Sequence, residues 1–208
     1  MVTRIEKQRI LYEEMTAYEK KYWNEGIVVG VDEVGRGPFA GPVTICAYAF
    51  KPNTYILGVN DSKKLSKKRR EEMYSELISI ALDYVVVSKS PEVIDEVNIL
   101  NATKIAMKEA VEKLKIKPRI ILVDAVNIPD INYEQLPIIK GDSKSISIAA
   151  ASIVAKYERD NYMLKQDELY PQYDFKNNMG YGTKRHIEAI KKYGLTEIHR
   201  RSFCKKYE

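Results

Sequence analysis

The stretch from residue 30 to residue 42, GVDEVGRGPFAGP, completes the apolar run IVVGV and continues into an adjacent pair of acids, Asp32 and Glu33. Short continuous apolar runs of this kind predict strands buried in the centre of an α/β sheet. The glycines and prolines after the pair interrupt regular structure and leave the backbone bare. The stretch therefore predicts a central strand that ends in two carboxylates and is followed by a loop that a ligand can approach closely.

The rest of the chain interleaves predicted strands with predicted helices. Apolar runs indicate the strands, whereas 3.6-residue periodicity and Ser or Ser-Pro start signals indicate the helices. Strands are expected over residues 27–31, 43–50, 84–88, 119–126 and 137–140, and helices over 3–23, 66–82, from 90 onward, over 101–115, 145–164 and 183–193. This order predicts an α/β sheet with helices on both faces. The length fits a single domain, residues 1–208, with an N-terminal helix within residues 1–25.

Composition narrows the class of protein. No apolar run is long enough to cross a bilayer, and the N-terminus lacks the apolar core of a signal peptide. We therefore expect a cytoplasmic protein with no membrane contact. The two cysteines, Cys46 and Cys204, lie far apart and form no metal-ligand motif, so we expect both to be reduced, packed thiols.

Positive charge is concentrated in two segments. Residues 176–208 contain nine Lys or Arg against three Glu, and residues 61–70, DSKKLSKKRR, contain six bases against one acid. Basic patches on an otherwise nearly neutral chain favour a polyanionic partner. Solvated helix faces would give the same pattern, and charge alone leaves both interpretations open.

Four acids follow apolar runs: Asp32 and Glu33 after IVVGV, Asp124 after IILV, and Asp142 before the long predicted helix. Each has a structural alternative, and Asp142 in particular is well placed as a helix N-cap. Ligands of open α/β sheets bind at the carboxyl ends of strands, and converging carboxylates repel unless a cation lies between them. Mg²⁺ prefers a few carboxylates with waters and substrate phosphates. The pattern therefore raises the hypothesis of a metal-dependent phosphoryl-transfer site.

The GRG sequence at residues 35–37 completes that hypothesis. Its glycines let main-chain groups approach a ligand, and Arg36 offers a forked donor for phosphate or carboxylate. The stretch is not a dinucleotide-binding fingerprint, because a proline follows and no helix begins there. A tight turn would also use this sequence, so the motif is weak by itself.

Six sequence blocks, in order along nearly the whole chain, carry a much more specific signal. They are GVDEVGRGPFAGPV, NDSKKLSKKRRE, LVDAVNIP, KGDSKSISIAAASIVAKYERD, NMGYGTKRH and HRRSF. In order and approximate spacing they resemble the bacterial ribonuclease HII family, from about residue 11 to Phe203.

The resemblance implies a ribonuclease H-like fold, with a mixed, mostly five-stranded sheet flanked by helices and a helical, substrate-binding C-terminal part over about residues 171–208. It implies a monomeric endonuclease that cuts the RNA strand of RNA–DNA hybrids and the 5′ side of single ribonucleotides in duplex DNA. Misincorporated ribonucleotides would thereby be removed. The implied cofactors are two divalent metal ions, Mg²⁺ or Mn²⁺.

The same resemblance implies roles for individual residues. The GRG backbone would sense the 2′-hydroxyl, the Tyr181 ring would pack on the next deoxyribose, and Lys63 would contact phosphates. The 2′-hydroxyl is the group that separates RNA from DNA at a given sugar. The implied metal-binding catalytic residues are Asp32, Glu33, Asp124 and Asp142, and the implied substrate-binding residues are Gly35, Arg36, Gly37, Lys63 and Tyr181.

Two alternatives are carried forward. Ribonuclease HIII is a sister type with a different motif in place of GRG and a longer N-terminal extension, and a non-catalytic nucleic-acid binder could share the fold. GRG favours the HII type, and four clustered carboxylates argue against a binder, because without a cation they would repel substrate phosphates. The two histidines, His186 and His199, are expected to be structural or close to phosphate and not metal ligands.

Overall fold

The computed structural model describes residues 3–56, 58–59 and 65–207, and its strands form one mixed five-stranded sheet with the order β3-β2-β1-β4-β5. The two central pairings differ: β1 runs antiparallel to β2 and parallel to β4. The strands are β1 (Val28–Val34), β2 (Val43–Phe50), β3 (Ala81–Lys89), β4 (Ile120–Asp124) and β5 (Gln135–Ile138). The predicted α/β class and the mixed five-stranded sheet are confirmed.

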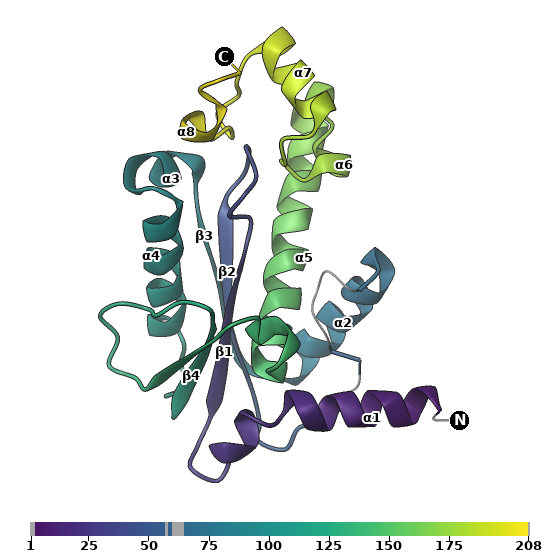
Figure 1. Cartoon of the computed structure of the whole chain (residues 1–208), viewed down its shortest axis with the longest axis vertical. Helices are drawn as coiled ribbons and strands as arrows, with labels where there is room; N and C mark the ends of the chain where they lie inside the picture. The colour runs from purple at the N-terminus through teal and green to yellow at the C-terminus, as the bar shows by residue number, and fades with distance from the viewer. Residues whose placement is uncertain (1–2, 57, 60–64, 208) are drawn as a thin grey trace.

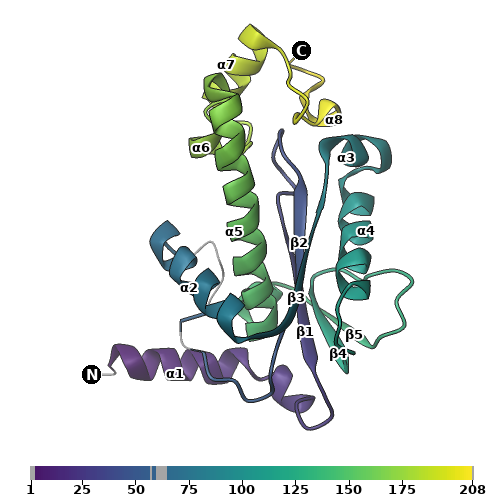
Figure 2. The same cartoon turned by 180° about the vertical axis from the view of Figure 1, so that it is seen from behind.

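Two long helices cover opposite faces of the sheet (Figures 1 and 2). α5 (Ile146–Leu169) packs on one face and α4 (Ile99–Glu112) on the other, so each face buries its own apolar cluster. At Gly30 of β1 the helix approaches so closely that an added Cβ would lie 2.0 Å from the Ser147 carbonyl carbon. Only glycine permits this contact, which holds the start of α5 against the central strand.

The remaining helices surround this core. α2 (Lys67–Ile80) begins after the predicted cap Ser66, whose side chain accepts from the Arg69 amide, and packs on α5. α3 begins at Pro91, as the Ser-Pro signal predicts. The other helical elements are α1 (Arg4–Met15), η1 (Glu19–Lys21), α3 (Pro91–Val97), η3 (Gly141–Ser143), η4 (Pro171–Tyr173), α6 (Phe175–Asn178), α7 (Lys184–Tyr193) and α8 (Arg201–Cys204).

The single N-terminal helix expected over residues 3–23 is wrong. α1 ends at Met15, where the Thr16 hydroxyl donates to the Tyr12 carbonyl, and a separate 3-10 turn, η1, follows. The chain leaves the helix because Glu19 is fully buried and accepts hydrogen bonds from the Ser145 hydroxyl and the Ser147 amide. A continued helix would carry this carboxylate past its partners.

The C-terminal part is helical, as predicted. Elements η4 to α8 enclose a third apolar cluster that includes Phe175, Ile190 and Cys204, and they lie beside the β1–β2 connection in Figure 1. Both Cys46 and Cys204 are buried, as expected for packed side chains. Within the residues described, no helix is both long and apolar enough to traverse a bilayer.

Candidate active site

The register of the β1–β4 pair places two of the predicted acids, Asp32 and Asp124, next to each other. Val31 pairs with Val123, so the next residues, Asp32 and Asp124, end the parallel β1–β4 ladder side by side. One ligand oxygen from each of Asp32, Glu33 and Asp124 lies within 4.8 Å of the others. Residues 92 positions apart therefore converge because parallel strands present their carboxyl ends at one edge of a sheet.

This acidic cluster carries unfavourable charge in the absence of a cation. Burial, then the neighbouring Glu33 and Asp124, raise the pKa of Asp32 well above its usual value. Burial also raises the pKa of Glu33, although the Arg36 guanidinium, 3.4 Å from Glu33 Oε1, opposes that shift. The fold thus holds carboxylates in an environment that disfavours their ionised form.

Asp142 lies beside the cluster without entering it. It is buried in η3, and its neighbour Gly141 donates its amide to Asp124 Oδ1 at 2.7 Å. The alternative in which Asp142 caps the long helix is wrong, because Ser145 is the N-cap of α5 and accepts from the Ile148 amide. The hydrogen bond from Gly141 therefore ties the segment carrying Asp142 to β4.

The GRG loop lies against the loop that carries Tyr181. A Cβ added to Gly37 would lie 3.7 Å from Cε1 of Tyr181, and that ring is 45% exposed. The amides of Phe39 and Ala40 both donate to the Gly180 carbonyl, which fixes the two loops to each other. Gly35 has φ of +88°, a conformation that favours glycine. The predicted ribose-reading residues are thus neighbours in space.

The sequence matches one known protein family over most of its length. The ribonuclease HII family model matches residues 29–206. The chain belongs to the ribonuclease HII family. It is 52% identical over 203 residues to ribonuclease HII of Clostridioides difficile, an alignment that covers 97% of this chain and 80% of that protein.

Solved structures agree with the family assignment. The ribonuclease H2 from Pyrococcus horikoshii OT3 aligns with a TM-score of 0.75 and 31% identity, over 88% of this chain and 97% of that one. Bst-RNase HIII in complex with Mn²⁺ aligns with a TM-score of 0.69 but 19% identity, over 87% of this chain and 68% of that one, which shows the shared fold alone. The chain is therefore an endonuclease of the ribonuclease HII type, and neither the HIII type nor a non-catalytic binder.

The acidic cluster fits a hard divalent cation. Three carboxylates offer oxygen ligands, and Glu33 Oε2 is buried with no hydrogen-bond partner among the residues described. A buried carboxylate oxygen without a donor is costly unless a cation approaches it. The donor set thus suits a hard divalent cation, since such ions prefer oxygen ligands.

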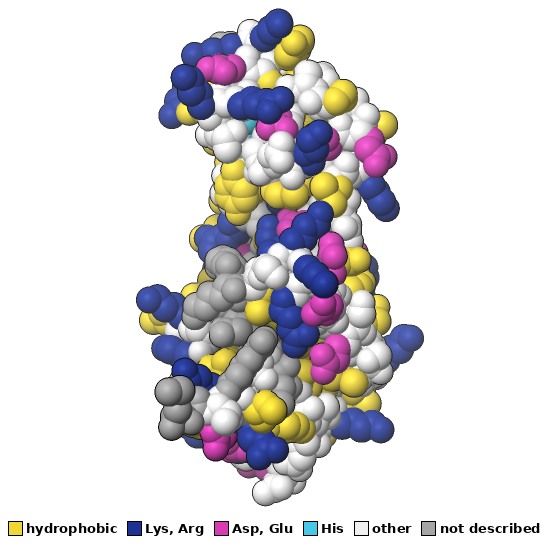
Figure 3. All heavy atoms as spheres, turned by 90° about the vertical axis from the view of Figure 1, so that its right-hand side faces the viewer, with side chains coloured by type: hydrophobic (Ala, Val, Ile, Leu, Met, Phe, Trp, Pro, Cys, Tyr) yellow, Lys and Arg dark blue, Asp and Glu magenta, His cyan; other side chains and the backbone are white. Residues whose placement is uncertain are grey.

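The basic segments are only partly available to a polyanion. Lys63 and its neighbours over 60–64 lie outside the described residues, so their predicted phosphate contact stays a prediction. Farther along the segment, Lys67 and Lys68 are exposed, whereas Arg70 pairs with Asp160. Figure 3 shows Lys and Arg side chains over the C-terminal elements and again lower on the same face, interspersed with acids.

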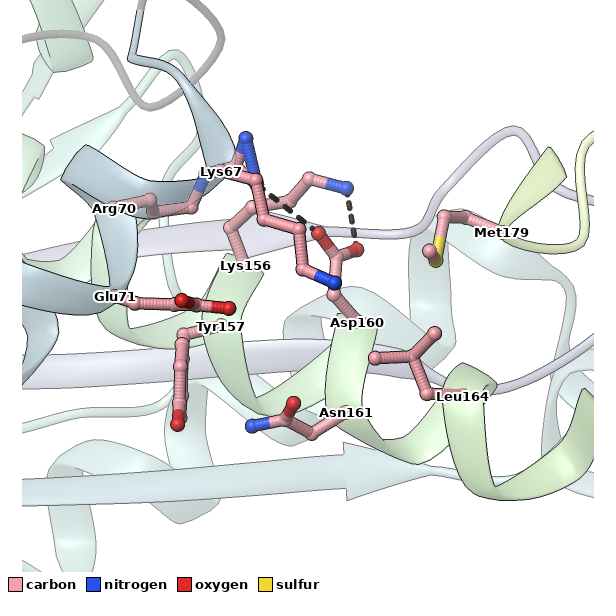
Figure 4. A pocket seen from close by; sticks show the side chains of 9 residues that line it. All are labelled: Lys67, Arg70, Glu71, Lys156, Tyr157, Asp160, Asn161, Leu164 and Met179. Atoms are coloured by element: carbon pink, nitrogen blue, oxygen red, sulfur yellow. Dashed lines mark hydrogen bonds and ion pairs between the residues drawn. The ribbon is translucent and has the colours of Figure 1, made fainter. Parts of the chain in front are cut away.

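A cavity of about 220 Å³ opens between α2 and α5 (Figure 4). Its lining combines Lys67, Arg70 and Lys156 with the apolar Leu164 and Met179. Asp160 occupies part of its wall and pairs with both Arg70 and Lys156, so much of the local positive charge is already neutralised.

One of the nine bases in residues 176–208 cannot contribute to a surface patch. Arg200 is fully buried. Exposed bases on the same segment, such as Lys191, Lys192 and Lys205, remain available. Burial of Arg200 follows from its hydrogen bonds to the GRG loop, which sequence pattern alone does not reveal.

The two histidines form a buried hydrogen-bonded chain. The Thr196 amide donates to Nδ1 of His199, which requires that the proton of neutral His199 lie on Nε2. His199 then donates to Nε2 of His186, 3.0 Å away, and His186 Nδ1 donates to the Tyr181 carbonyl. Both rings are therefore neutral and structural, and they anchor the backbone at Tyr181.

This arrangement predicts acid sensitivity. Burial, then the neighbouring His186, lower the pKa of His199 to about 4. Because the folded pKa lies below the unfolded value near 6.5, the unfolded chain binds more protons in that window, and stability falls as pH drops below 6.5. We expect a loss of up to about 3 kcal/mol from this group between pH 7 and pH 4.

The measurement is thermal or urea unfolding at pH 7 and pH 5, with a His199→Gln variant as the control. The amide does not titrate, so the variant should lose less stability over this interval than the wild type. Equal losses would show that groups other than His199 control the acid response.

Proposed function

We propose that this chain, acting as one catalytic domain, cleaves the phosphodiester bond on the 5′ side of a ribonucleotide, both in RNA–DNA hybrids and at single ribonucleotides in duplex DNA. The observation that carries the proposal is the placement of the carboxylate cluster of Asp32, Glu33 and Asp124 at the end of the strand from which the GRG loop continues. The carboxylate cluster would perform the hydrolysis, and the adjacent GRG loop would distinguish ribose from deoxyribose.

The choice of sugar would come from the GRG loop and Tyr181. Glycine backbone groups can reach a 2′-hydroxyl at close range whatever the base, which suits an enzyme that acts on ribonucleotides in any sequence. The partly exposed Tyr181 ring, next to Gly37, would pack on the adjoining deoxyribose. A deoxyribose in the reading position lacks the hydroxyl and would leave these groups unpaired.

The chemistry would use the four acids. Asp32, Glu33, Asp124 and Asp142 would hold divalent ions, Mg²⁺ or Mn²⁺, which in such sites activate water and stabilise the leaving oxygen. Asp32 and Asp124 are fixed by hydrogen bonds from the amides of Glu33 and Gly141, at 2.7 Å each, so their orientation is set before substrate binds. Arg36 now pairs with Glu33. A cation bound beside Glu33 would replace Arg36 there, and Arg36 could then bind a substrate phosphate.

The test is a cleavage assay on a DNA duplex bearing one ribonucleotide, with Mg²⁺, with Mn²⁺ and with EDTA. We expect cleavage with a divalent ion and none with EDTA, and products that carry 5′-phosphate and 3′-hydroxyl ends. The all-DNA duplex of the same sequence is the control and should stay intact. A 2′,3′-cyclic phosphate would contradict attack by water and would indicate attack by the neighbouring 2′-hydroxyl.

Binding to the duplex should depend steeply on salt. If about five phosphates are contacted by the exposed bases, the logarithm of the binding constant should fall against the logarithm of salt concentration with a slope of about −4 to −5. Fluorescence anisotropy with a labelled duplex at constant metal concentration measures this slope. A Lys67→Ala, Lys68→Ala double variant should reduce its magnitude, whereas a slope near zero would assign these charges to solvated surface.

A further inference from the structure

Two buried arginines donate hydrogen bonds to backbone carbonyls of the GRG loop, residues 35–42. Arg159 on α5 is 1% exposed and Arg200 before α8 is 0% exposed. Arg200 donates to the carbonyls of Gly35 (2.6 Å), Arg36 (2.9 Å) and Gly41 (3.0 Å). The guanidinium thereby binds both ends of the loop.

Arg159 binds the same loop from the side of α5. It donates to the carbonyls of Ala40 (3.0 Å) and Pro42 (2.9 Å), and to that of Met179 (3.0 Å) in the Tyr181 loop. A Cβ added to Gly35 would lie 2.2 Å from Arg159 Nε, so the loop rests directly on this side chain. One guanidinium therefore connects the two loops that would read the ribose.

Neither arginine has a carboxylate partner among the residues described. The acid next in sequence to Arg159, Asp160, pairs with Arg70 and Lys156 instead, and the Arg200 guanidinium lies 5.2 Å from the Phe203 ring centroid. Burial, then the charge of Arg159, lower the pKa of Arg200 to about 9. Two buried cations that form no direct ion pair among the residues described are costly, and apolar side chains could fill a merely structural position more cheaply.

The orientation of the loop follows from these bonds. The carbonyls of Gly35 and Arg36 point inward to Arg200, whereas the structure, over the residues it describes, shows no hydrogen bond from the amides of Gly35, Arg36 or Gly37. By contrast, the amides of Phe39, Ala40 and Gly41 are all paired within the protein. The unpaired donors are thus confined to the GRG segment, above two positive charges.

We propose that Arg159 and Arg200 are positioning residues that turn the GRG carbonyls inward and so present its amides, in a positive field, to the ribose and phosphate of the substrate. The inference rests on the proposed function, since it explains how that loop reads its ligand. Lysine is not equivalent at either position: it keeps the charge, but it cannot donate in a planar fork to three separate carbonyls.

The test compares wild type, Arg200→Lys and Arg159→Lys, with Arg119→Lys as a matched control. Arg119 precedes β4 at the end opposite Asp124 and pairs with Glu25 and Glu134. Three quantities are measured: kcat/KM on the duplex with one ribonucleotide, the Kd for the all-DNA duplex of the same sequence, and the Tm shift caused by Mn²⁺. Circular dichroism establishes which variants fold.

For Arg200→Lys and Arg159→Lys we expect kcat/KM to fall at least tenfold, while the Kd for all-DNA duplex stays within twofold and the Mn²⁺-induced Tm shift persists. Arg119→Lys should leave all three unchanged. The positioning role is wrong if the folded variants show a lower kcat/KM together with weaker binding of all-DNA duplex and no Mn²⁺-induced Tm shift. It is also wrong if none of the three quantities changes. If one variant fails to fold, the other decides. A wild type that does not cut at the ribonucleotide would instead contradict the proposed function.

Discussion

Asp124→Asn should remove nearly all cleavage while preserving the fold. The substituted amide keeps the shape of the side chain and an oxygen that can accept from the Gly141 amide, but it removes a negative charge from the cluster with Asp32 and Glu33. Since a single electrostatic group in an active site commonly accounts for a 10²–10³-fold effect, we expect cleavage to fall by about 10³-fold. Single-turnover cleavage of the duplex with one ribonucleotide measures the loss.

The stability of a second variant of the same cluster, Asp32→Asn, separates the loss of a metal ligand from a structural defect. The pKa of Asp32 is raised, so the folded state binds more protons than the unfolded state above the usual aspartate pKa, and the ionised carboxylate destabilises the metal-free fold at neutral pH. Asp32→Asn should therefore raise the Tm in EDTA at pH 8, and this gain should shrink as the pH falls toward 4. It should also diminish the stabilisation by Mg²⁺. A variant that is inactive and less stable at pH 8 would indicate a structural defect and not the loss of a ligand.

The strands and their acids could be predicted because their signals are local. The run IVVGV followed by Asp32 and Glu33, and the run IILV followed by Asp124, read directly as buried strands that end in carboxylates. Parallel pairing then places both ends at one edge of the sheet, as the register of β1 and β4 bears out. Asp142 was harder to place, because its turn, η3, precedes the helix that it was expected to cap.

The supporting interactions could not be predicted because their partners are distant in sequence. Arg200 reads as one more base in a basic segment, yet it binds carbonyls more than 150 positions earlier. Glu19 falls within the helix expected over residues 3–23, yet it is buried against Ser145 and Ser147, and this contact ends the N-terminal helix early. No periodicity distinguishes such residues, since tertiary contacts override local preference.

Gly37→Ala should remove most cleavage at a lone ribonucleotide without unfolding the protein. The backbone of Gly37 lies outside the left-handed region. Among the residues described, an added Cβ would meet only Cε1 of Tyr181, at an ordinary contact distance of 3.7 Å. Its methyl would nevertheless occupy the surface between the loop and the ring, where the ribose is proposed to lie. Excluding one sugar from its position misaligns the phosphate, so we expect about a 10²-fold loss in kcat/KM.

Gly35→Ala is the contrasting variant, because its defect lies in the fold. An added Cβ would lie 2.2 Å from Arg159 Nε and 2.8 Å from the Pro42 carbonyl, at a φ of +88°, so we expect about 2–4 kcal/mol of destabilisation. Gly194→Ala separates the causes. The φ of Gly194 is +79°, and no described residue lies within 4 Å of an added Cβ, so this variant should cost only the backbone strain of about 1–2 kcal/mol. Urea unfolding and kcat/KM for all three variants decide the matter. If Gly37→Ala keeps its cleavage rate, the space beside Tyr181 does not hold the ribose, whatever the stability of the other two.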